Sequence, residues 1–377
     1  MHFDLTPVQR SLQEQTAARV ADALPPELCA MPGRARWLAA GEAGLLGLCL
    51  PAEHGGAALG MLDTALALEA FGRACEDTGF AFAVAAHLLA CGVPIAAHGS
   101  PELRDELLGG LVAGRLIAAN AMTEDGAGSD VSAMATTARP DGEGGYVLDG
   151  EKSWASNAPE ADVIVTYAIT DPQAGFLGQT AFAVAASLDG VGCSEPLEKM
   201  GLDSCLAGRV HFDRCRVVAH HRLGHEGAGQ AVFQHSMGWE RSCLFAIYLG
   251  QMDRQIATCS AHVKGRRQFG ARLSERQAVS HRIADMIGRL EAARMLLYRA
   301  CWMADAGGHD PTATALSKVA VSEAAVANGT DAVQLLGAAG YACAGGVERQ
   351  LRDALGARIF SGTSEIQREL IARGAGL

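Results

Sequence analysis

The chain has 377 residues and a formal net charge of −11. It is long enough for two or three domains or subdomains, because a single hydrophobic core stops growing below this size. An acidic chain without a concentrated basic surface is poorly suited to displace counterions from phosphates, so we expect no nucleic-acid partner.

The first residues of the chain lack the basic and apolar stretches of a secretory signal, so we expect a cytoplasmic protein. Eleven cysteines are scattered singly, which predicts reduced thiols. The histidines and cysteines do not have the spacing typical of a metal site, so we expect no bound metal. The most apolar stretch, residues 81–97, is interrupted by His87 and Pro94 and is shorter than the roughly 20 apolar residues that span a bilayer. It predicts a buried helix, and we expect no membrane partner.

Residues 1–118 predict a helical N-terminal domain. Leu62–Gly72 is rich in good helix formers, and Pro51, Gly55 and Pro94 separate the helical segments.

Residues 119–222 predict a β domain, because short runs of β-branched and apolar residues are bounded by turn residues. Such runs occupy residues 163–165, 181–184 and 209–212. Within residues 146–152, the pair Asp149-Gly150 is the strongest short signal for a hairpin, so we expect a hairpin turn there.

Residues 223–377 predict a helical domain. Its clearest apolar stripe repeats at spacings of three and four residues and consists of Val279, Ile283, Met286, Ile287, Leu290, Ala293 and Leu297. The order helices, strands, helices, without alternating β–α–β units, argues against a Rossmann fold. It predicts an α+β fold that is mainly α.

Small residues dominate a loop at residues 123–130 (TEDGAGSD). Such a loop lets backbone N–H groups and two hydroxyls approach a planar polar ligand. On composition alone, a Gly-rich turn between domains is the more common explanation.

Three segments together resemble the acyl-CoA dehydrogenase family of flavoenzymes: residues 122–130 (MTEDGAGSD), 266–270 (RRQFG) and 357–367 (ARIFSGTSEIQ). The resemblance extends along nearly the whole chain. It implies an N-terminal helical domain, a middle β domain and a C-terminal four-helix bundle, with non-covalent FAD. The implied reaction is α,β-dehydrogenation of an acyl thioester to the 2,3-enoyl thioester.

The resemblance also implies a set of FAD-binding residues: Met122, Thr123, Gly128, Ser129, Trp154, Ser156, Arg266, Gln268, Phe269, Gln277, Gln334, Gly337, Ala338, Thr363 and Glu365. Simpler explanations stay open for several of them. Trp154 suits ordinary core filling, and Arg266 suits a solvated charge at a helix end. Gln277 also completes a capping box with Ser274, and Thr363 suits simple N-capping.

The position at which many family members carry a catalytic glutamate is Ser361 in this chain, so the base is expected elsewhere. Glu240 precedes Leu244 and Ile247 by four and seven residues, which predicts that its carboxylate lies on an apolar helix face. Burial there would raise its pKa towards neutrality, as proton abstraction from carbon requires. Pairing with Arg241 or a lysine is the structural alternative. One subgroup of the family places its catalytic glutamate at the position of Glu240.

For the acyl pocket, the resemblance implies Ser129, Arg241, Phe360 and Ser361 as substrate-binding residues. Implied partners are an acyl-CoA or an acyl or peptidyl carrier protein as substrate, and an electron-transfer flavoprotein or oxygen as acceptor. In the family, the elements matching Arg266 and Gln334 bind FAD across a subunit interface, which implies a homo-oligomer, a dimer or a tetramer. The alternatives are a flavin-dependent monooxygenase or oxidase of the same fold, and a non-catalytic FAD- or acyl-binding protein.

Overall fold

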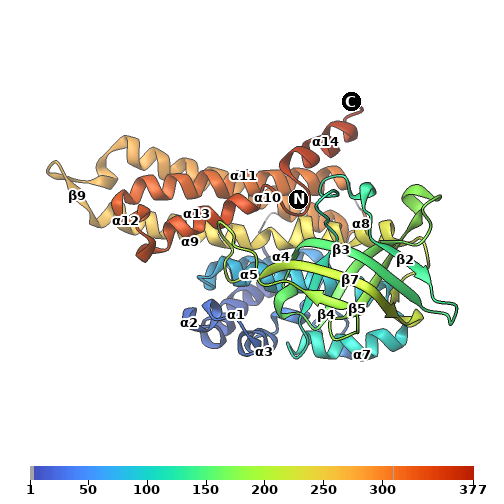
Figure 1. Ribbon diagram of the computed structural model, residues 1–377. Coiled ribbons are helices and arrows are strands. Elements are labelled where there is room, and N and C mark those ends of the chain that lie inside the picture. The colour runs from blue at the N-terminus through green and yellow to red at the C-terminus, as the bar shows by residue number, and fades with distance from the viewer. Residues whose placement is uncertain (1–3, 309) are drawn as a thin grey trace.

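The computed structural model describes residues 4–308 and 310–377. Helices occupy the first part of the chain, where they form a layer below a long helical bundle, and the sheet lies beside both (Figure 1). The first helices are α1 (Pro7–Ala23), α2 (Pro26–Ala30), α3 (Arg34–Glu42), α4 (Met61–Ala74), α5 (Thr78–Ala86), α6 (Val93–His98) and α7 (Pro101–Val112).

Between α5 and α6 the chain continues as a π-helical segment, His87–Gly92. Within the described residues, the run Thr78–His98 is long and apolar enough to cross a membrane, but 89% of its most apolar window is buried inside the protein. The apolar stretch predicted to be a buried helix is therefore a core helix of this fold, interrupted by the π-helical segment.

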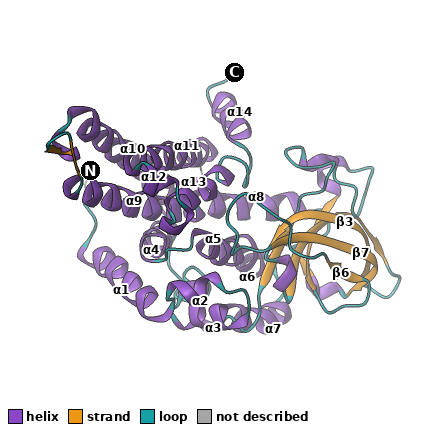
Figure 2. Cartoon of the chain, turned by 60° about the vertical axis from the view of Figure 1, so that its left-hand side comes forward, coloured by secondary structure: helices purple, strands orange, loops and turns teal. Residues whose placement is uncertain are grey.

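The strands form an eight-stranded sheet in the order β6-β7-β3-β1-β4-β5-β8, with β2 paired to β3 and β4. Figure 2 shows the strands grouped beside the helices. Most neighbouring strands are antiparallel, whereas β4 runs parallel to both β1 and β2. Their bounds are β1 (Ala118–Ala121), β2 (Thr137–Pro140), β3 (Tyr146–Ser156), β4 (Val163–Ile169), β5 (Gln179–Ala185), β6 (Val191–Cys193), β7 (Ala207–Val217) and β8 (Arg222–Leu223).

The predicted hairpin turn at Asp149-Gly150 is wrong, because both residues lie inside the continuous strand β3. Gly150 has φ +146° and lies where the pairing of β3 with β7 shifts register. A Cβ atom at Gly150 would lie 2.6 Å from Oγ1 of Thr136. Here the Asp-Gly pair therefore forms a β-bulge that lets another segment approach closely, and it does not reverse the chain.

The remaining helices are α8 (Gly229–Trp239), α9 (Ala246–Gly265), α10 (Gln277–Asp305), α11 (Pro311–Leu336), α12 (Ala338–Tyr341), α13 (Val347–Gly356) and α14 (Ser364–Gly374). The long helices α9, α10 and α11 pack along one another. In the predicted stripe of α10, Met286, Leu290, Ala293 and Leu297 are buried, but Ile287 is 45% exposed. A short hairpin of β9 (Arg267–Gln268) and β10 (Ala271–Arg272) joins α9 to α10.

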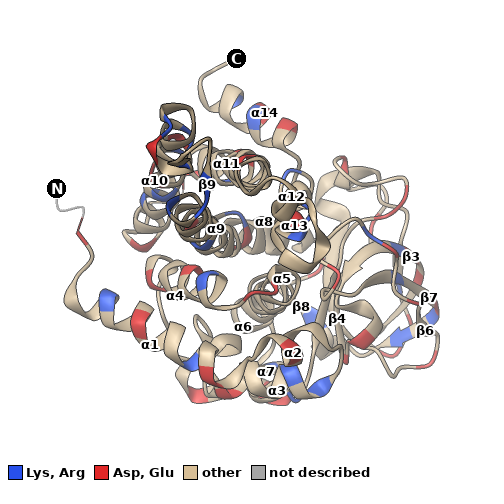
Figure 3. Ribbon diagram, turned by 90° about the vertical axis from the view of Figure 1, so that its left-hand side faces the viewer, with Lys and Arg blue, Asp and Glu red and all other residues tan. Residues whose placement is uncertain are grey.

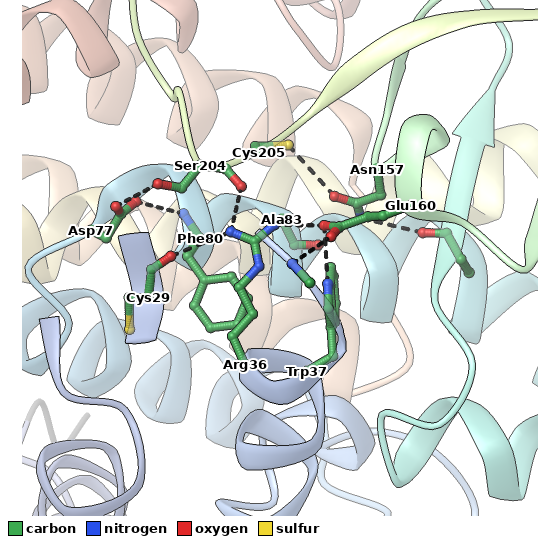
Figure 4. A network of polar contacts seen from close by, with 12 residues as sticks. Cys29, Arg36, Trp37, Asp77, Phe80, Ala83, Asn157, Glu160, Ser204 and Cys205 are labelled. Atoms are coloured by element: carbon green, nitrogen blue, oxygen red, sulfur yellow. Dashed lines mark hydrogen bonds and ion pairs between the residues drawn. The ribbon is translucent and has the colours of Figure 1, made fainter. Parts of the chain in front are cut away.

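A buried arginine ties α3 to the β region (Figure 4). Arg36 is fully buried and donates to Oε1 of Glu160 at 2.6 Å and to the carbonyl of Ser204 at 2.8 Å. Trp37 donates to the same Glu160 oxygen at 3.0 Å. Because a buried guanidinium must be paired, this network fixes how the first helices sit against the sheet.

Candidate active site

Two π-helical segments pack against each other beside the sheet. One is His87–Gly92, which also contacts β1 and β4, and the other is Glu240–Leu244, which joins α8 to α9. Inserted π turns of this kind are frequent at functional sites. Glu240 is the first residue of the second segment, so the regular helix assumed for its side-chain direction does not exist there, although the predicted burial is correct.

The Glu240 side chain is enclosed in the protein, with 6% of the residue exposed. Its Oε2 accepts a hydrogen bond from Oγ of Ser361 at 3.3 Å, and its Oε1 has no hydrogen-bond partner among the described residues. Burial raises the pKa of Glu240 to about 7, against smaller opposing effects of Arg241 and Ser361. A carboxylate with one free oxygen and this pKa suits proton abstraction near neutral pH.

The structural alternative of a Glu240–Arg241 ion pair is not realised among the described residues. Arg241 instead donates from Nε to the carbonyl of Ser361 at 3.0 Å. Ser361 adopts φ +54° and the following Gly362 adopts φ +87°. Gln367 donates to the Gly362 carbonyl at 3.1 Å. Arg241 and Gln367 therefore hold a tight left-handed turn against the base, and this turn presents the Ser361 hydroxyl to Glu240.

Phe360, predicted to line the acyl pocket, belongs to an aromatic cluster next to this turn. Its ring centroid lies 4.5 Å from that of Phe82 and 5.5 Å from that of Phe245. Cys91 and Tyr167 are buried and interact electrostatically with Glu240, so they lie near the same carboxylate. The sequence did not mark either residue. Cys91 lies in the π-helical segment, which was not predicted, and Tyr167 lies in strand β4, where almost every residue is buried and none stands out.

The small-residue loop predicted to contact FAD follows β1 and is anchored by a buried ion pair. Lys152 is fully buried and donates to Oε1 of Glu124 at 2.8 Å. Glu124 also accepts from the backbone N–H groups of Ala135 at 2.6 Å and Thr136 at 3.0 Å. Burial tends to raise the pKa of Glu124, but these donors together hold it below its usual value. The buried Glu124 therefore anchors the loop to the protein, while Gly128 and Ser129 remain exposed.

Trp154 and Ser156 lie on the strand that borders this loop. Ser153 donates its backbone N–H to the carbonyl of Thr123 at 2.8 Å, and Ser156 pairs with β1. Trp154 adopts φ +57° and is 58% exposed, so it does not fill the core. A large exposed indole beside a loop of small residues and hydroxyls fits a planar polar group such as a flavin.

Thr363 caps α14, since its side chain accepts from the backbone N–H of Ile366 at 3.3 Å. Glu365 is exposed in the first turn of the same helix. The simple capping interpretation of Thr363 is therefore confirmed, and the contacts of both residues with FAD stay a prediction.

The other predicted FAD residues lie at the far end of the bundle. Arg266, Gln268 and Phe269 lie on or beside the β9–β10 hairpin, and Gln334, Gly337 and Ala338 lie where α11 gives way to α12. Both places are remote from the sheet (Figure 1). Phe269 is 95% exposed. These residues do not join Thr123 and Trp154 in one site within a single chain.

The proposed capping box of Ser274 and Gln277 does not form. Helix α10 begins at Gln277 with Arg276 as its N-cap residue, and among the described residues no side chain caps it. Residues 273–275 form a separate turn, in which Glu275 accepts from the backbone N–H of Arg272 at 3.2 Å. A capping box would need a helix that starts directly after Ser274. Because residues 273–275 form their own turn and α10 starts only at Gln277, the Gln277 side chain has no capping role.

Family comparisons agree with this architecture along almost the entire chain. Residues 6–115, 119–215 and 227–376 match the acyl-CoA dehydrogenase N-terminal, middle and C-terminal domains, respectively. The chain therefore belongs to the acyl-CoA dehydrogenase family, with the fold class predicted from the sequence.

Several individual proteins of this family are similar to the chain along most of its length. A protein of Pseudomonas fluorescens, L-prolyl-(peptidyl-carrier protein) dehydrogenase, is 52% identical over 338 residues, covering 90% of this chain and 89% of its own length. A protein of the same name from a Serratia species is 45% identical, covering 87% of this chain and 85% of its own. A solved structure described as PigA with FAD and proline is 41% identical, with a TM-score of 0.97 and full coverage of both chains.

The chain is an FAD-dependent oxidoreductase that dehydrogenates an acyl thioester, acting on its CH–CH group. The predicted family, enzyme class and cofactor are thereby confirmed. The alternatives of a monooxygenase and of a non-catalytic binding protein are set aside.

Proposed function

We propose that this enzyme oxidises a prolyl group carried as a thioester on a peptidyl carrier protein, with Glu240 as the base that removes the α proton. The observation that carries the assignment of the base is the buried Glu240 carboxylate, with its pKa near 7 and its unpartnered Oε1. The names of the two relatives at 52% and 45% identity support the substrate.

In this proposal the α proton passes to Oε1 of Glu240. The Ser361 hydroxyl holds Oε2, so the carboxylate keeps one orientation while its other oxygen faces the substrate. The cluster of Phe82, Phe245 and Phe360 excludes water beside the reacting carbons, which keeps the carboxylate basic. Loss of the α proton and of the β hydride leaves a carbon–carbon double bond conjugated with the thioester.

FAD, when bound, supplies the acceptor for the β hydride. The residues that would hold its ring are Met122, Thr123, Gly128, Ser129, Trp154 and Ser156, and Thr363 and Glu365 would meet its adenosine side. The predicted substrate contacts of Ser129 and Arg241 belong to the same proposal. An electron-transfer flavoprotein or oxygen is the proposed final electron acceptor.

The substrate assignment is tested with a panel of thioesters under anaerobic conditions. The FAD-loaded enzyme is mixed with a prolyl carrier protein, an alanyl carrier protein and butyryl-CoA, and flavin absorbance is followed. The prolyl carrier protein is expected to bleach the flavin fastest and to lose two hydrogens by mass spectrometry. Faster bleaching by butyryl-CoA would overturn the assignment to a carrier-bound prolyl group.

Replacing Ser361 by alanine is expected to move the pH dependence of the reaction upward. Burial raises the pKa of Glu240 and the Ser361 hydrogen bond opposes that rise, so its loss shifts the pKa further above about 7. Because the ionised carboxylate is the base, wild-type anaerobic flavin reduction rises with pH through about 7. In Ser361→Ala the curve of flavin-reduction rate against pH is expected to shift to higher pH and to reach a similar maximum rate. Stopped-flow measurement of flavin absorbance gives these rates. Ser364→Ala, which removes a hydroxyl bound to Glu323, is the control and leaves the curve in place.

We further propose that the enzyme is a homo-oligomer in which the β9–β10 hairpin reaches the FAD of a neighbouring subunit. The exposed hairpin region carries Arg266, Arg267, Arg272 and Arg276, and Figure 3 shows basic residues gathered at this end of the bundle. A cluster of arginines suits a diphosphate, because the guanidinium makes paired charge-assisted hydrogen bonds. This arginine cluster is far from the loop that would hold FAD in the same chain, which supports a contact with the FAD of a neighbouring subunit.

Arg266→Ala is expected to weaken FAD binding about 10- to 100-fold, the effect of losing one charge-assisted contact of roughly 1.5–3 kcal/mol. The measurement is fluorescence titration of the apoprotein with FAD, with sedimentation of the same samples. Arg214→Ala, an exposed arginine on β7, is the control and leaves the affinity unchanged. FAD binding of wild-type strength by a monomeric fraction would contradict the cross-subunit proposal.

A further inference from the structure

Two adjacent histidines and a glutamate meet on the side of the molecule where α7 packs against the end of the sheet. His220 and His221 lie in the turn between β7 and β8, and Glu106 lies on α7. One side-chain ligand atom from each residue lies within 4.8 Å of the others. These residues have no part in the dehydrogenase site described above.

The distances within this cluster match those between ligands of one small metal ion. Oε2 of Glu106 lies 3.3 Å from Nε2 of His221 and 3.8 Å from Nε2 of His220. Tetrahedral ligands with bonds of about 2.1 Å are separated by roughly 3.4 Å. The geometry is therefore close to that of three ligands with a fourth position left for water.

The hydrogen bonds of His221 favour a cation between these atoms. Its Nδ1 lies 3.0 Å from the carbonyl of Ala183, which can only accept, so Nδ1 carries the proton. In the neutral ring, Nε2 then presents a lone pair to the Glu106 carboxylate, which also cannot donate. A backbone carbonyl behind the distal nitrogen is the usual outer partner of a metal-bound histidine.

Both imidazoles lie next to one carboxylate oxygen. The ring centroids of His220 and His221 are 4.6 Å apart, and Nε2 of each ring lies within 4 Å of Oε2 of Glu106. One divalent cation between these atoms would bind both imidazoles and the carboxylate. Glu102, one turn earlier on α7, also interacts electrostatically with His220 and adds negative charge on the same side.

The elements that carry the three residues are held in place independently of any ion. Ser100 donates to the carbonyl of His220 at 3.3 Å and accepts from the backbone N–H of Leu103 at 3.2 Å, so it links the histidine turn to the start of α7. The backbone N–H of His221 donates to the carbonyl of Val218 at 3.1 Å. A ligand set on such fixed backbone loses little entropy on binding.

We infer that Glu106, His220 and His221 form a site for one divalent cation of the Zn²⁺ class, which fastens α7 to the turn that precedes β8. Two imidazoles and one carboxylate are a donor set typical of Zn²⁺. The sequence predicted no metal, because Glu106 is far along the chain from the two adjacent histidines and the three residues match no spacing motif. Its role is structural, since the three residues lie outside the base and the flavin loop.

Isothermal titration of the chelator-treated, FAD-loaded enzyme with Zn²⁺ tests this site. Wild type is expected to bind about one ion per chain and to gain thermal stability when it does. Glu106→Gln and His220→Gln alter half-exposed side chains, so the fold is kept, and each should weaken binding more than tenfold. His225→Gln, an exposed histidine nearby, should bind as wild type does.

Three results would overturn the inference. They are no saturable binding by wild type, unchanged binding by Glu106→Gln and His220→Gln, and loss of binding on substitution of His98. His98 contacts His235 with ring nitrogens 3.0 Å apart, so this pair is the competing place for an ion.

Discussion

Glu240→Gln is expected to lower turnover about 10²–10⁴-fold, the usual effect of removing a general base. The amide keeps the volume and can still accept from Ser361, but it cannot take a proton. FAD content and secondary structure are therefore expected to stay at wild-type values. Steady-state turnover together with the flavin-to-protein absorbance ratio checks both parts of this result.

The same substitution is expected to stabilise the enzyme at alkaline pH. The pKa of Glu240 is about 7 in the folded protein and 4.5 ordinarily. Its contribution to stability is therefore complete below pH 4.5 and is lost as the pH rises through about 7, where the buried group ionises. Glutamine does not ionise, so the Tm of the variant should exceed that of wild type above pH 7. Equal pH dependence of both Tm values would show that Glu240 is not desolvated.

A second substitution separates loss of the base from loss of structure. Ser361 touches Glu240, so glutamate at position 361 would place a carboxylate beside the same substrate carbon. Adding Ser361→Glu to Glu240→Gln is expected to restore part of the turnover. Recovery will be incomplete, because position 361 has φ +54°, a conformation that costs a non-glycine residue energy.

Lys152→Met is expected to destabilise the fold by about 3–5 kcal/mol, the effect of removing one partner of a buried ion pair. Glu124 would remain enclosed at 9% side-chain exposure without its ammonium partner. Because Glu124 anchors the loop of Thr123 and Ser129, FAD affinity should fall as well. Urea unfolding and FAD titration measure the two effects.

Arg209→Met is the matched control for that experiment. Arg209 pairs with Asp125 and Glu151 at the surface of the same region, with 42% of its side chain exposed. An exposed pair of this kind contributes about 0–1 kcal/mol. Similar destabilisation by the two substitutions would show that the loop does not depend on the buried pair.

Fold class and cofactor could be predicted because they rest on features spread over many residues. The change from helical to strand-forming sequence is visible at the residue level, and the motifs around Thr123, Arg266 and Thr363 each add to one family pattern. The burial of Glu240 followed from its apolar neighbours Leu244 and Ile247, which are themselves fully buried. Its role as the base stays a prediction.

What the sequence could not predict depends on contacts between distant segments. The π-helical start at Glu240 follows no residue pattern, and the segment packs against His87–Gly92, which is distant in the sequence. Asp149-Gly150 has the composition of a turn, yet the approach of Thr136 makes it a bulge. Cys91 and Tyr167 reach the base from two other elements, and no local signal marks them.

Anaerobic single-turnover reduction of the enzyme-bound flavin by the prolyl carrier protein is the sharpest test of Glu240 as the base, since it isolates the chemical step from reoxidation. Wild type and Glu240→Gln are compared by stopped flow at a pH above 7, where the base is ionised. If Glu240 is the base, reduction should be at least ~100-fold slower in the variant, within the range for loss of a general base. Reduction at the wild-type rate in Glu240→Gln would contradict it and place the base elsewhere.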